Sequence, residues 1–270
     1  MTQQKEMSFL SHLEELRWHL VRSAVAIFLL GIVFFAFAEA VYNNFLLAHI
    51  QSDFITYQLF CDFFTFFDIE SDFCSINFSD KKLQSIKVTS QLMNSLWTSF
   101  ILGVIVAFPY ILWEFWRFIS PGLHENERRQ SRGFIFIASL LFFFGVLFSF
   151  YVIAPISIHF LYNYQITDSI QNNFTLESHI GLVTNMILGV SVLFELPVII
   201  YFLAKIGLIT PAFLKRYRKH ALVFVLIIAA IITPPDVASQ IIVSIPVLIL
   251  YEISIRVAAI VIKRQQKNAK

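Results

Sequence analysis

Long apolar runs dominate the chain and are separated by short polar segments. A helix that crosses a bilayer needs about 20 consecutive, mostly apolar residues. Four stretches meet this requirement: 21–41, 92–113, 134–156 and 180–203. Two further apolar runs, 221–232 and 237–262, follow them. The pattern predicts helices throughout, with lipid rather than water around many of them.

A double proline separates the last two apolar runs. Pro234 and Pro235 remove two backbone donors and disfavour helix at the preceding residue. We therefore expect a tight turn between a short fifth helix and a sixth one, with Asp236 as the N-cap of the sixth. The sequence predicts six transmembrane helices.

The composition supports a membrane protein. Apolar residues make up 57% of the 270 residues, charged residues 14%, and the mean hydropathy is +0.72. Soluble domains carry about 25% charged residues. The net charge of +2 gives no reason to expect a nucleic-acid partner. We interpret residues 1–270 as one all-α membrane domain.

Clusters of lysine and arginine occur in every second connecting segment, and this pattern predicts the orientation of the chain in the membrane. Basic clusters flank the first span on its N-terminal side and follow the second, fourth and sixth spans. The other connections carry few or no basic residues, and the outer loop 42–87 has three lysines against six acids. Both termini are therefore expected on the cytoplasmic side of the inner membrane.

Four of the expected spans contain proline, at Pro109, Pro155, Pro197 and Pro246. In a membrane bundle such prolines kink helices, and neighbouring groups satisfy the freed carbonyls. The prolines predict a kinked, concave bundle.

The N-terminal segment has helical periodicity. Phe9, Leu13, Leu16 and Leu20 fall on one face, which indicates a helix that lies at the membrane surface before it turns in. Its polar residues fit either a solvated face with an ordinary capping box or a binding surface.

The segment after the second span is aromatic and then charged. Trp113, Trp116 and Phe118 are typical of a membrane interface. Glu125 and Glu127 follow among arginines, where local salt bridges are the simplest interpretation.

Four motifs together resemble the TatC family, the multi-spanning receptor of twin-arginine protein translocation. They are Phe9-Leu-x-His-Leu-x-Glu-Leu-Arg17, Phe115-Trp-x-Phe-Ile-x-Pro-Gly-Leu-x-x-x-Glu-Arg-Arg129, Phe194-Glu-x-Pro197, and Thr233-Pro-Pro-Asp236 with Gln240. Their order and their positions in a six-span plan make the resemblance specific. The outer loop 42–87 shows no clear match.

The resemblance implies a receptor for signal peptides that carry paired arginines. Glu15 and Glu127 match the family's two acidic residues, Phe118 matches a nearby aromatic, and Arg17 belongs to the first motif. The chemistry is reasonable because a planar guanidinium can grip a carboxylate through two hydrogen bonds, whereas lysine is a point charge. His19 stands where the family often has arginine.

Ionisable and polar residues within the spans are the next candidates. Glu195 lies in an apolar run, where a charge costs at least roughly 2.5 kcal/mol by insertion scales, so a functional interpretation is the default. The alternative is a glutamate that only pins helices together. Glu252 is a weaker candidate, and Gln240 could join a polar cluster with the short fifth helix.

The two cysteines, Cys61 and Cys74, both fall in the outer loop. Their proximity and an oxidising compartment favour a disulfide, while separate packing under the Phe-rich loop is the alternative.

The sequence fits two other functions less well. A small-molecule or ion transporter would need several ionisable groups at mid-membrane depth, and Glu195 is nearly alone. An enzyme would need paired catalytic residues within the spans, but His159 and His179 are expected near an outer edge and His220 near an inner one. We expect no catalytic residue, metal or cofactor.

By resemblance, the partners would be single-span subunits of the TatA and TatB type, signal peptides of folded cargo proteins, membrane lipid and further copies of this chain. The family draws its energy from the transmembrane proton gradient.

Overall fold

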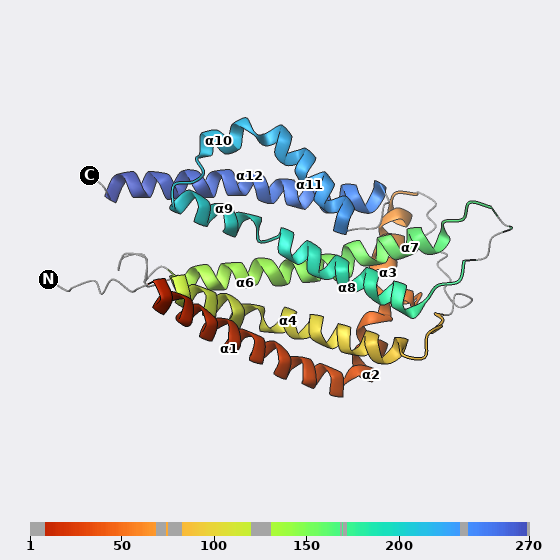
Figure 1. The fold of residues 1–270 in the computed structure, drawn as a ribbon. Coiled ribbons are helices and arrows are strands. Elements are labelled where there is room, and N and C mark those ends of the chain that lie inside the picture. Colours follow the sequence, from red (N-terminus) through yellow and green to blue (C-terminus); the bar gives the residue numbers. More distant parts are fainter. Residues whose placement is uncertain are drawn as a thin grey trace. The chain divides into compact units, whose positions relative to one another are not determined.

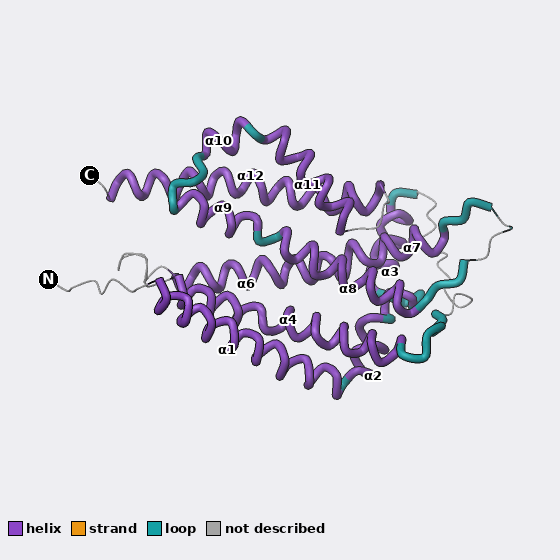
Figure 2. The backbone as a smooth tube through the Cα atoms, in the orientation of Figure 1, coloured by secondary structure: helices purple, strands orange, loops and turns teal. Residues whose placement is uncertain are grey.

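The computed structural model describes residues 9–68, 74, 83–119, 131–167, 169, 172–232 and 237–268. These residues are almost entirely helical (Figure 2). The described residues contain one isolated β-bridge, between Gln84 and Thr175. The prediction of an all-α protein is confirmed.

The chain divides into two compact units, Met1–Ala38 with Ser95–Leu140, and Glu39–Asn94 with Leu141–Lys270. The main helices, labelled in Figure 1, are α1 (Phe9–Ala36), α2 (Ala38–Val41), α3 (Ile55–Phe66), α4 (Ser90–Ile119), α6 (Ser131–Phe148), α7 (Ala154–Asn163), α8 (Leu176–Leu193), α9 (Leu196–Lys205), α10 (Pro211–Arg216), α11 (Arg218–Ile232) and α12 (Val237–Asn268). The described residues also include the short helical turns η1 (Tyr42–Leu46), η2 (Ala48–Ile50) and η5 (Ser149–Ile153). The first unit is built on α1 and α4, and the second holds most of the remaining helices.

Five helical stretches among the described residues are long and apolar enough to cross a membrane: Leu13–Ala36, Ser90–Ile119, Ile135–Asn163, Leu176–Lys205 and Gln240–Lys263. They correspond to five of the six predicted spans. The predicted fifth span coincides with α11, which has 15 residues and is not among the five. The turn 233–236, with Pro234, Pro235 and Asp236, lies outside the described residues. Six crossings therefore remain a prediction.

In the first unit, α1 and α4 lie side by side (Figure 1), and glycines allow their backbones to approach closely. A Cβ atom on Gly103 would lie 2.7 Å from the carbonyl oxygen of Ile27, and one on Gly31 would lie 3.5 Å from that of Ser99. Small residues allow helix backbones to approach this closely in membranes. Pro109 lies inside α4, which continues through it.

In the second unit, proline interrupts two of the spans. Pro155 follows the π-helical turn η5, in which the N–H of Ala154 bonds to Ser149 instead of Phe150. The carbonyl of Tyr151 also loses its helical donor, because proline has no N–H. Pro197 opens α9 after the break that separates it from α8.

Side chains from the outer loop satisfy the two freed carbonyls. His49 Nε2 lies 2.8 Å from the oxygen of Phe150, and Thr56 Oγ1 lies 2.6 Å from that of Tyr151. Unsatisfied backbone groups are costly away from water, so these contacts hold the loop against the interrupted helix.

Two outer-loop side chains, His49 and Tyr57, are buried in their neutral forms. The Tyr57 hydroxyl lies 2.8 Å from the carbonyl of His49, and burial raises the pKa of Tyr57. Burial lowers the pKa of His49 to about 4. The hydrogen bond to Phe150 raises this pKa, but its effect is smaller than that of burial. His49 is therefore neutral and donates its Nε2–H to Phe150.

His179 lies near the start of α8, but its side chain is buried rather than exposed at an interface. It lies 3.0 Å from the hydroxyl of Tyr162 and 3.2 Å from the carbonyl oxygen of Leu46. Its partners are thus structural groups of the second unit.

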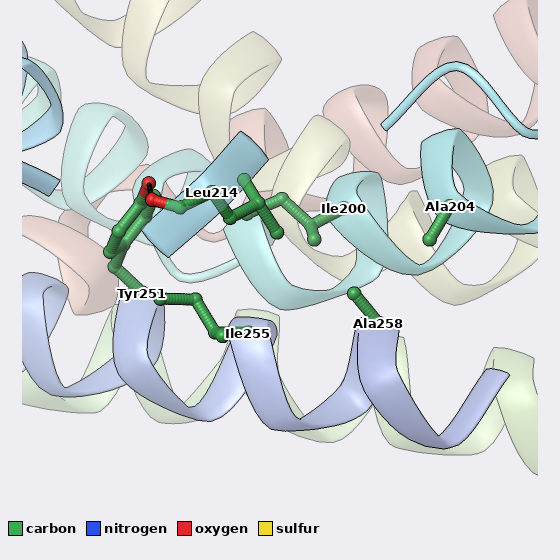
Figure 3. Packing of buried hydrophobic residues seen from close by; sticks show 6 residues of the cluster. All are labelled: Ile200, Ala204, Leu214, Tyr251, Ile255 and Ala258. Carbon is green, nitrogen blue, oxygen red and sulfur yellow. Dashed lines mark hydrogen bonds between the residues drawn. The ribbon is translucent and has the colours of Figure 1, made fainter. Parts of the chain in front are cut away.

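The connection between α9 and α11 is fixed to α12 by an apolar cluster (Figure 3). The Tyr251 hydroxyl donates to the carbonyl of Leu214 at 2.9 Å. Thr210 caps α10 by accepting from the N–H of Phe213 at 3.2 Å. The members of the cluster are Ile200, Ala204, Leu214, Tyr251, Ile255 and Ala258.

Candidate functional site

A buried carboxylate lies near the C-terminal end of α4, in the first unit. The residue is Glu114, with 1% of its surface exposed. The imidazole Nδ1 of His19 on α1 contacts Glu114 Oε2, and the Tyr110 hydroxyl donates to Oε1 at 3.0 Å. A buried charge is costly unless it is paired and hydrogen-bonded, and these two partners meet that need.

Two arginines add positive charge around this carboxylate. Arg22 lies 3.9 Å from one oxygen of Glu114, and Arg117 lies 3.6 Å from the other. Both guanidinium groups are about half exposed, and Arg117 also lies over the Trp113 ring at 4.9 Å. The result is a polar cluster of Glu114, His19, Tyr110, Arg22 and Arg117, which we call the Glu114 cluster.

The contacts of α1 with α4 fix the register between the two helices. His19 meets Glu114, Ile27 meets Gly103, and Gly31 meets Ser99. As the residue number rises along α1 it falls along α4, so the helices are antiparallel.

This register brings two candidate residues to the same level. Glu15 precedes His19 by one turn of α1, and Phe118 follows Glu114 by one turn of α4. The rings of His19 and Phe118 already lie 6.2 Å apart, centre to centre. Glu15 is half-buried and Arg17 is exposed. Glu127, the second acidic candidate, lies outside the described residues.

Glu195 lies in the break between α8 and α9, in the second unit. Its side chain is buried, with 7% of the residue exposed. Among the described residues neither carboxylate oxygen has a hydrogen-bond partner. The contacts therefore do not support the simple alternative of a glutamate that pins helices by hydrogen bonds.

The two other polar candidates within the spans have partners. Gln240 Nε2 donates to the carbonyl of Leu226 at 3.0 Å, which joins α12 to the short helix α11. Glu252 forms an ion pair with Arg218 at 2.7 Å, and both side chains are about half exposed. Glu252 is therefore a paired rather than an isolated charge, and it lies within the candidate span Gln240–Lys263.

The outer-loop cysteines, Cys61 on α3 and Cys74, are joined in a disulfide. Thr65 lies one turn after Cys61 and donates to its carbonyl oxygen at 2.8 Å. Among the described residues there is no group of three or more His, Cys, Asp or Glu side chains that could hold a metal.

Glu114 is not among the residues that the sequence predicts for the site. It stands at the end of an apolar run, between Trp113 and Trp116. The aromatic residues around it suggest a membrane interface and draw attention away from the carboxylate. One sequence feature could have pointed to it: His19 stands where arginine is expected. In the structure His19 contacts Glu114, which lies 95 positions later in the chain.

Comparison with known proteins decides the family. The family model described as "Sec-independent protein translocase protein (TatC)" matches residues 11–246. The chain belongs to the TatC family. It is therefore a membrane subunit of the Sec-independent, twin-arginine protein translocase.

Individual TatC proteins agree with this assignment. The chain is 39% identical over 263 residues to the Sec-independent protein translocase protein TatC of Blattabacterium sp. subsp. Periplaneta americana, covering 97% of this chain and 99% of that one. It is 45% identical over 163 residues to the TatC of Helicobacter pylori strain J99, covering 60% of this chain and 65% of that one. A crystal structure titled as the twin-arginine translocase receptor TatC matches with a TM-score of 0.70 and 31% identity, covering 93% of this chain and 99% of the other.

Proposed function

We propose that this chain is the signal-peptide receptor of its translocase and that it binds paired arginines at the cytoplasmic face. The proposal rests chiefly on the antiparallel register of α1 and α4, which sets Glu15 level with Phe118 at one end of the first unit. The similar solved protein is titled a twin-arginine translocase receptor, which supports the same role here.

In this proposal the first arginine of the signal peptide pairs with Glu15 and the second with Glu127. A bidentate guanidinium–carboxylate pair has geometry that lysine cannot reproduce, which would give preference for Arg-Arg over Lys-Lys. Phe118 would cover the pair and reduce its exposure to water, and a lower local dielectric strengthens the attraction. Arg17 lies on the same segment and would contact the polar part of the peptide.

The Glu114 cluster has a positioning role in this scheme. It joins α1 to α4 one turn away from both Glu15 and Phe118, and so fixes the separation of the carboxylate from the aromatic ring. Its own carboxylate is already paired with His19 and hydrogen-bonded to Tyr110, so we assign the peptide's arginines to Glu15 and Glu127 instead.

Further steps are assigned to the second unit. The apolar part of the signal peptide would insert beside Glu195, whose buried carboxylate lacks a hydrogen-bond partner among the described residues.

Single-span subunits of the TatA and TatB type would then assemble around several copies of this chain. The proton gradient would drive export of the folded cargo. Gln240 and Glu252 are proposed as contact points for partner helices.

In the proposed topology the chain crosses the inner membrane six times, with α11 as a short fifth crossing. Both termini lie in the cytoplasm. In that topology Glu15 and Glu127 share the cytoplasmic face. The chain's apolar helices and its family agree with a membrane location.

Photo-crosslinking tests the receptor role. A twin-arginine peptide that carries a photoreactive group should crosslink to membranes containing this protein, and a Lys-Lys version should crosslink far less. Glu15→Arg and Glu127→Arg should each abolish the product, whereas Glu14→Arg, at the exposed neighbouring position, should not. Undiminished crosslinking of inserted, folded Glu15→Arg and Glu127→Arg variants would contradict the proposal.

A further inference from the structure

A stripe of large apolar side chains lies uncovered on α3, in the second unit. Ile55, Leu59, Phe63 and Phe66 recur at spacings of three and four residues, so they share one face of the helix. Their exposed fractions are 54%, 62%, 57% and 82%. Their spacing and exposure show one continuous apolar surface, which we call the α3 stripe. Single exposed apolar side chains are common on proteins, but a continuous exposed stripe marks an interaction surface.

The first turn of α3 is packed on the third candidate span. Thr56 and Tyr57 are buried, and their hydroxyls reach the carbonyls of Tyr151 and Pro155 at 2.6 and 3.2 Å. Tyr57 lies on the face opposite the stripe and Thr56 lies beside its edge, so the helix is held in place while the four stripe residues stay exposed.

These hydrogen bonds also fix the depth of α3 along that span. Tyr151 and Pro155 precede the end of the helix at Asn163 by twelve and eight residues, which is about 18 and 12 Å at 1.5 Å per residue. The span Ile135–Asn163 has 29 residues, so a centred hydrocarbon core of about 30 Å leaves roughly 7 Å of helix beyond each boundary. The attachment points of α3 therefore lie inside the hydrocarbon boundary on the Asn163 side.

We propose that the α3 stripe is a lipid-binding surface, buried in the acyl chains of the leaflet on the Asn163 side, which the proposed topology makes the outer leaflet. The polar edge of α3, with Gln58, Asp62 and Thr65, faces the headgroups. The disulfide from Cys61 to Cys74 ties the segment that follows to the same helix.

The charge pattern narrows the class of lipid. Residues 42–68 contain no lysine or arginine, while Asp53, Asp62 and Asp68 are exposed. Binding therefore depends on burial of apolar surface in acyl chains and not on attraction to anionic headgroups.

A photoreactive amino acid at Phe63 or Phe66, in the full chain in native membranes, tests this inference. Phe66 is the safer site because 82% of its surface is exposed. Thr65, which lies about 160° around the helix from Phe63, is the matched control. Mass spectrometry then separates adducts with phospholipid from adducts with protein.

The expected result is phospholipid adducts at positions 63 and 66, several-fold more than at 65, with a yield that does not change with salt. Adducts with another protein or a second copy of the chain at these positions would overturn the inference in favour of a protein partner. Equal yields at 63, 65 and 66, or no adducts at 63 and 66, would overturn it in favour of an exposed surface. Signal-peptide binding is not involved in any of these outcomes.

Discussion

The imidazole of His19 on α1 contacts the buried carboxylate of Glu114 on α4, 95 positions later in the sequence. One turn from this contact on each helix stand Glu15 and Phe118. The pair thus links the fold of the first unit to the proposed receptor surface, since any loosening of His19 from Glu114 changes where Glu15 stands relative to Phe118.

Replacing His19 by alanine should weaken binding of a twin-arginine peptide about tenfold, or about 1.4 kcal/mol, although both proposed peptide ligands remain. His19→Arg should restore binding, because arginine can pair with the same carboxylate. Affinity is measured by fluorescence anisotropy with the protein in nanodiscs. Ser23→Ala, one turn further along α1, serves as the control, since the Ser23 hydroxyl bonds to the His19 carbonyl within α1, at 2.9 Å.

Spin labels at Arg17 and Ile119 separate a positioning role from simple loss of fold. The distance distribution between them should broaden in His19→Ala and narrow again in His19→Arg. An unchanged, narrow distribution in His19→Ala together with weaker binding would contradict the positioning role of the pair.

Gly103→Ala should lower the stability of the first unit by about 1–3 kcal/mol, because a new Cβ would lie 2.7 Å from the backbone oxygen of Ile27. A backbone atom cannot move aside as a flexible side chain can. Gly181→Ala is the matched control, since nothing lies within 4 Å of its Cβ position. Thermal unfolding of the purified protein in detergent measures both. Equal unfolding temperatures for the two variants would show that α1 and α4 are not packed at this distance.

Cys61 and Cys74 should resist a maleimide reagent until a reductant is added. The bridge closes a short loop, with a sequence separation of 13, and loop-closure arguments give it about 3 kcal/mol of stabilisation. Cys61→Ser should therefore lower stability without changing peptide binding. Two cysteines that react fully in unreduced protein would exclude the disulfide.

Acid should destabilise the packing of the outer loop through His49. Its pKa is about 4 in the folded protein and about 6.5 when exposed, so the unfolded state takes up the proton first as the pH falls. Stability is full above about pH 6.5 and declines towards pH 4, by about 3 kcal/mol at most.

His49→Gln should remove this pH dependence, since an amide N–H can still donate to Phe150 but does not titrate. His220→Gln, an exposed histidine, is the control. Unfolding midpoints at pH 7.5 and 4.5 provide the comparison. An acid shift of the same size in His49→Gln and in wild type would assign the effect to another group.

Five of the spans could be predicted from the sequence because lipid imposes a simple rule, about 20 apolar residues per crossing. The effect of Pro155 was also predictable in kind, since proline always frees a carbonyl. The groups that fill the gap, His49 and Thr56, were not, because they come from a loop about 100 positions earlier.

The candidate site was predictable only where it is local in sequence. Glu15 and Phe118 belong to short motifs, and the resemblance identified both. Glu114 is defined by a partner on another helix, and no periodicity in one segment shows that contact. The register of α1 with α4 depends on the close approach at Gly31 and Gly103, which again is a property of two helices together.

The receptor role of Glu15 is decided by the equilibrium affinities of an Arg-Arg and a Lys-Lys signal peptide for wild type, Glu15→Gln and Glu14→Gln. Glu15→Gln should weaken Arg-Arg binding by about 10- to 100-fold, the loss of one charge-assisted pair of about 1.5–3 kcal/mol, and bring it close to Lys-Lys binding. Glu14→Gln should bind as wild type does. Equal Arg-Arg affinities in wild type and Glu15→Gln would show that Glu15 does not hold an arginine of the peptide.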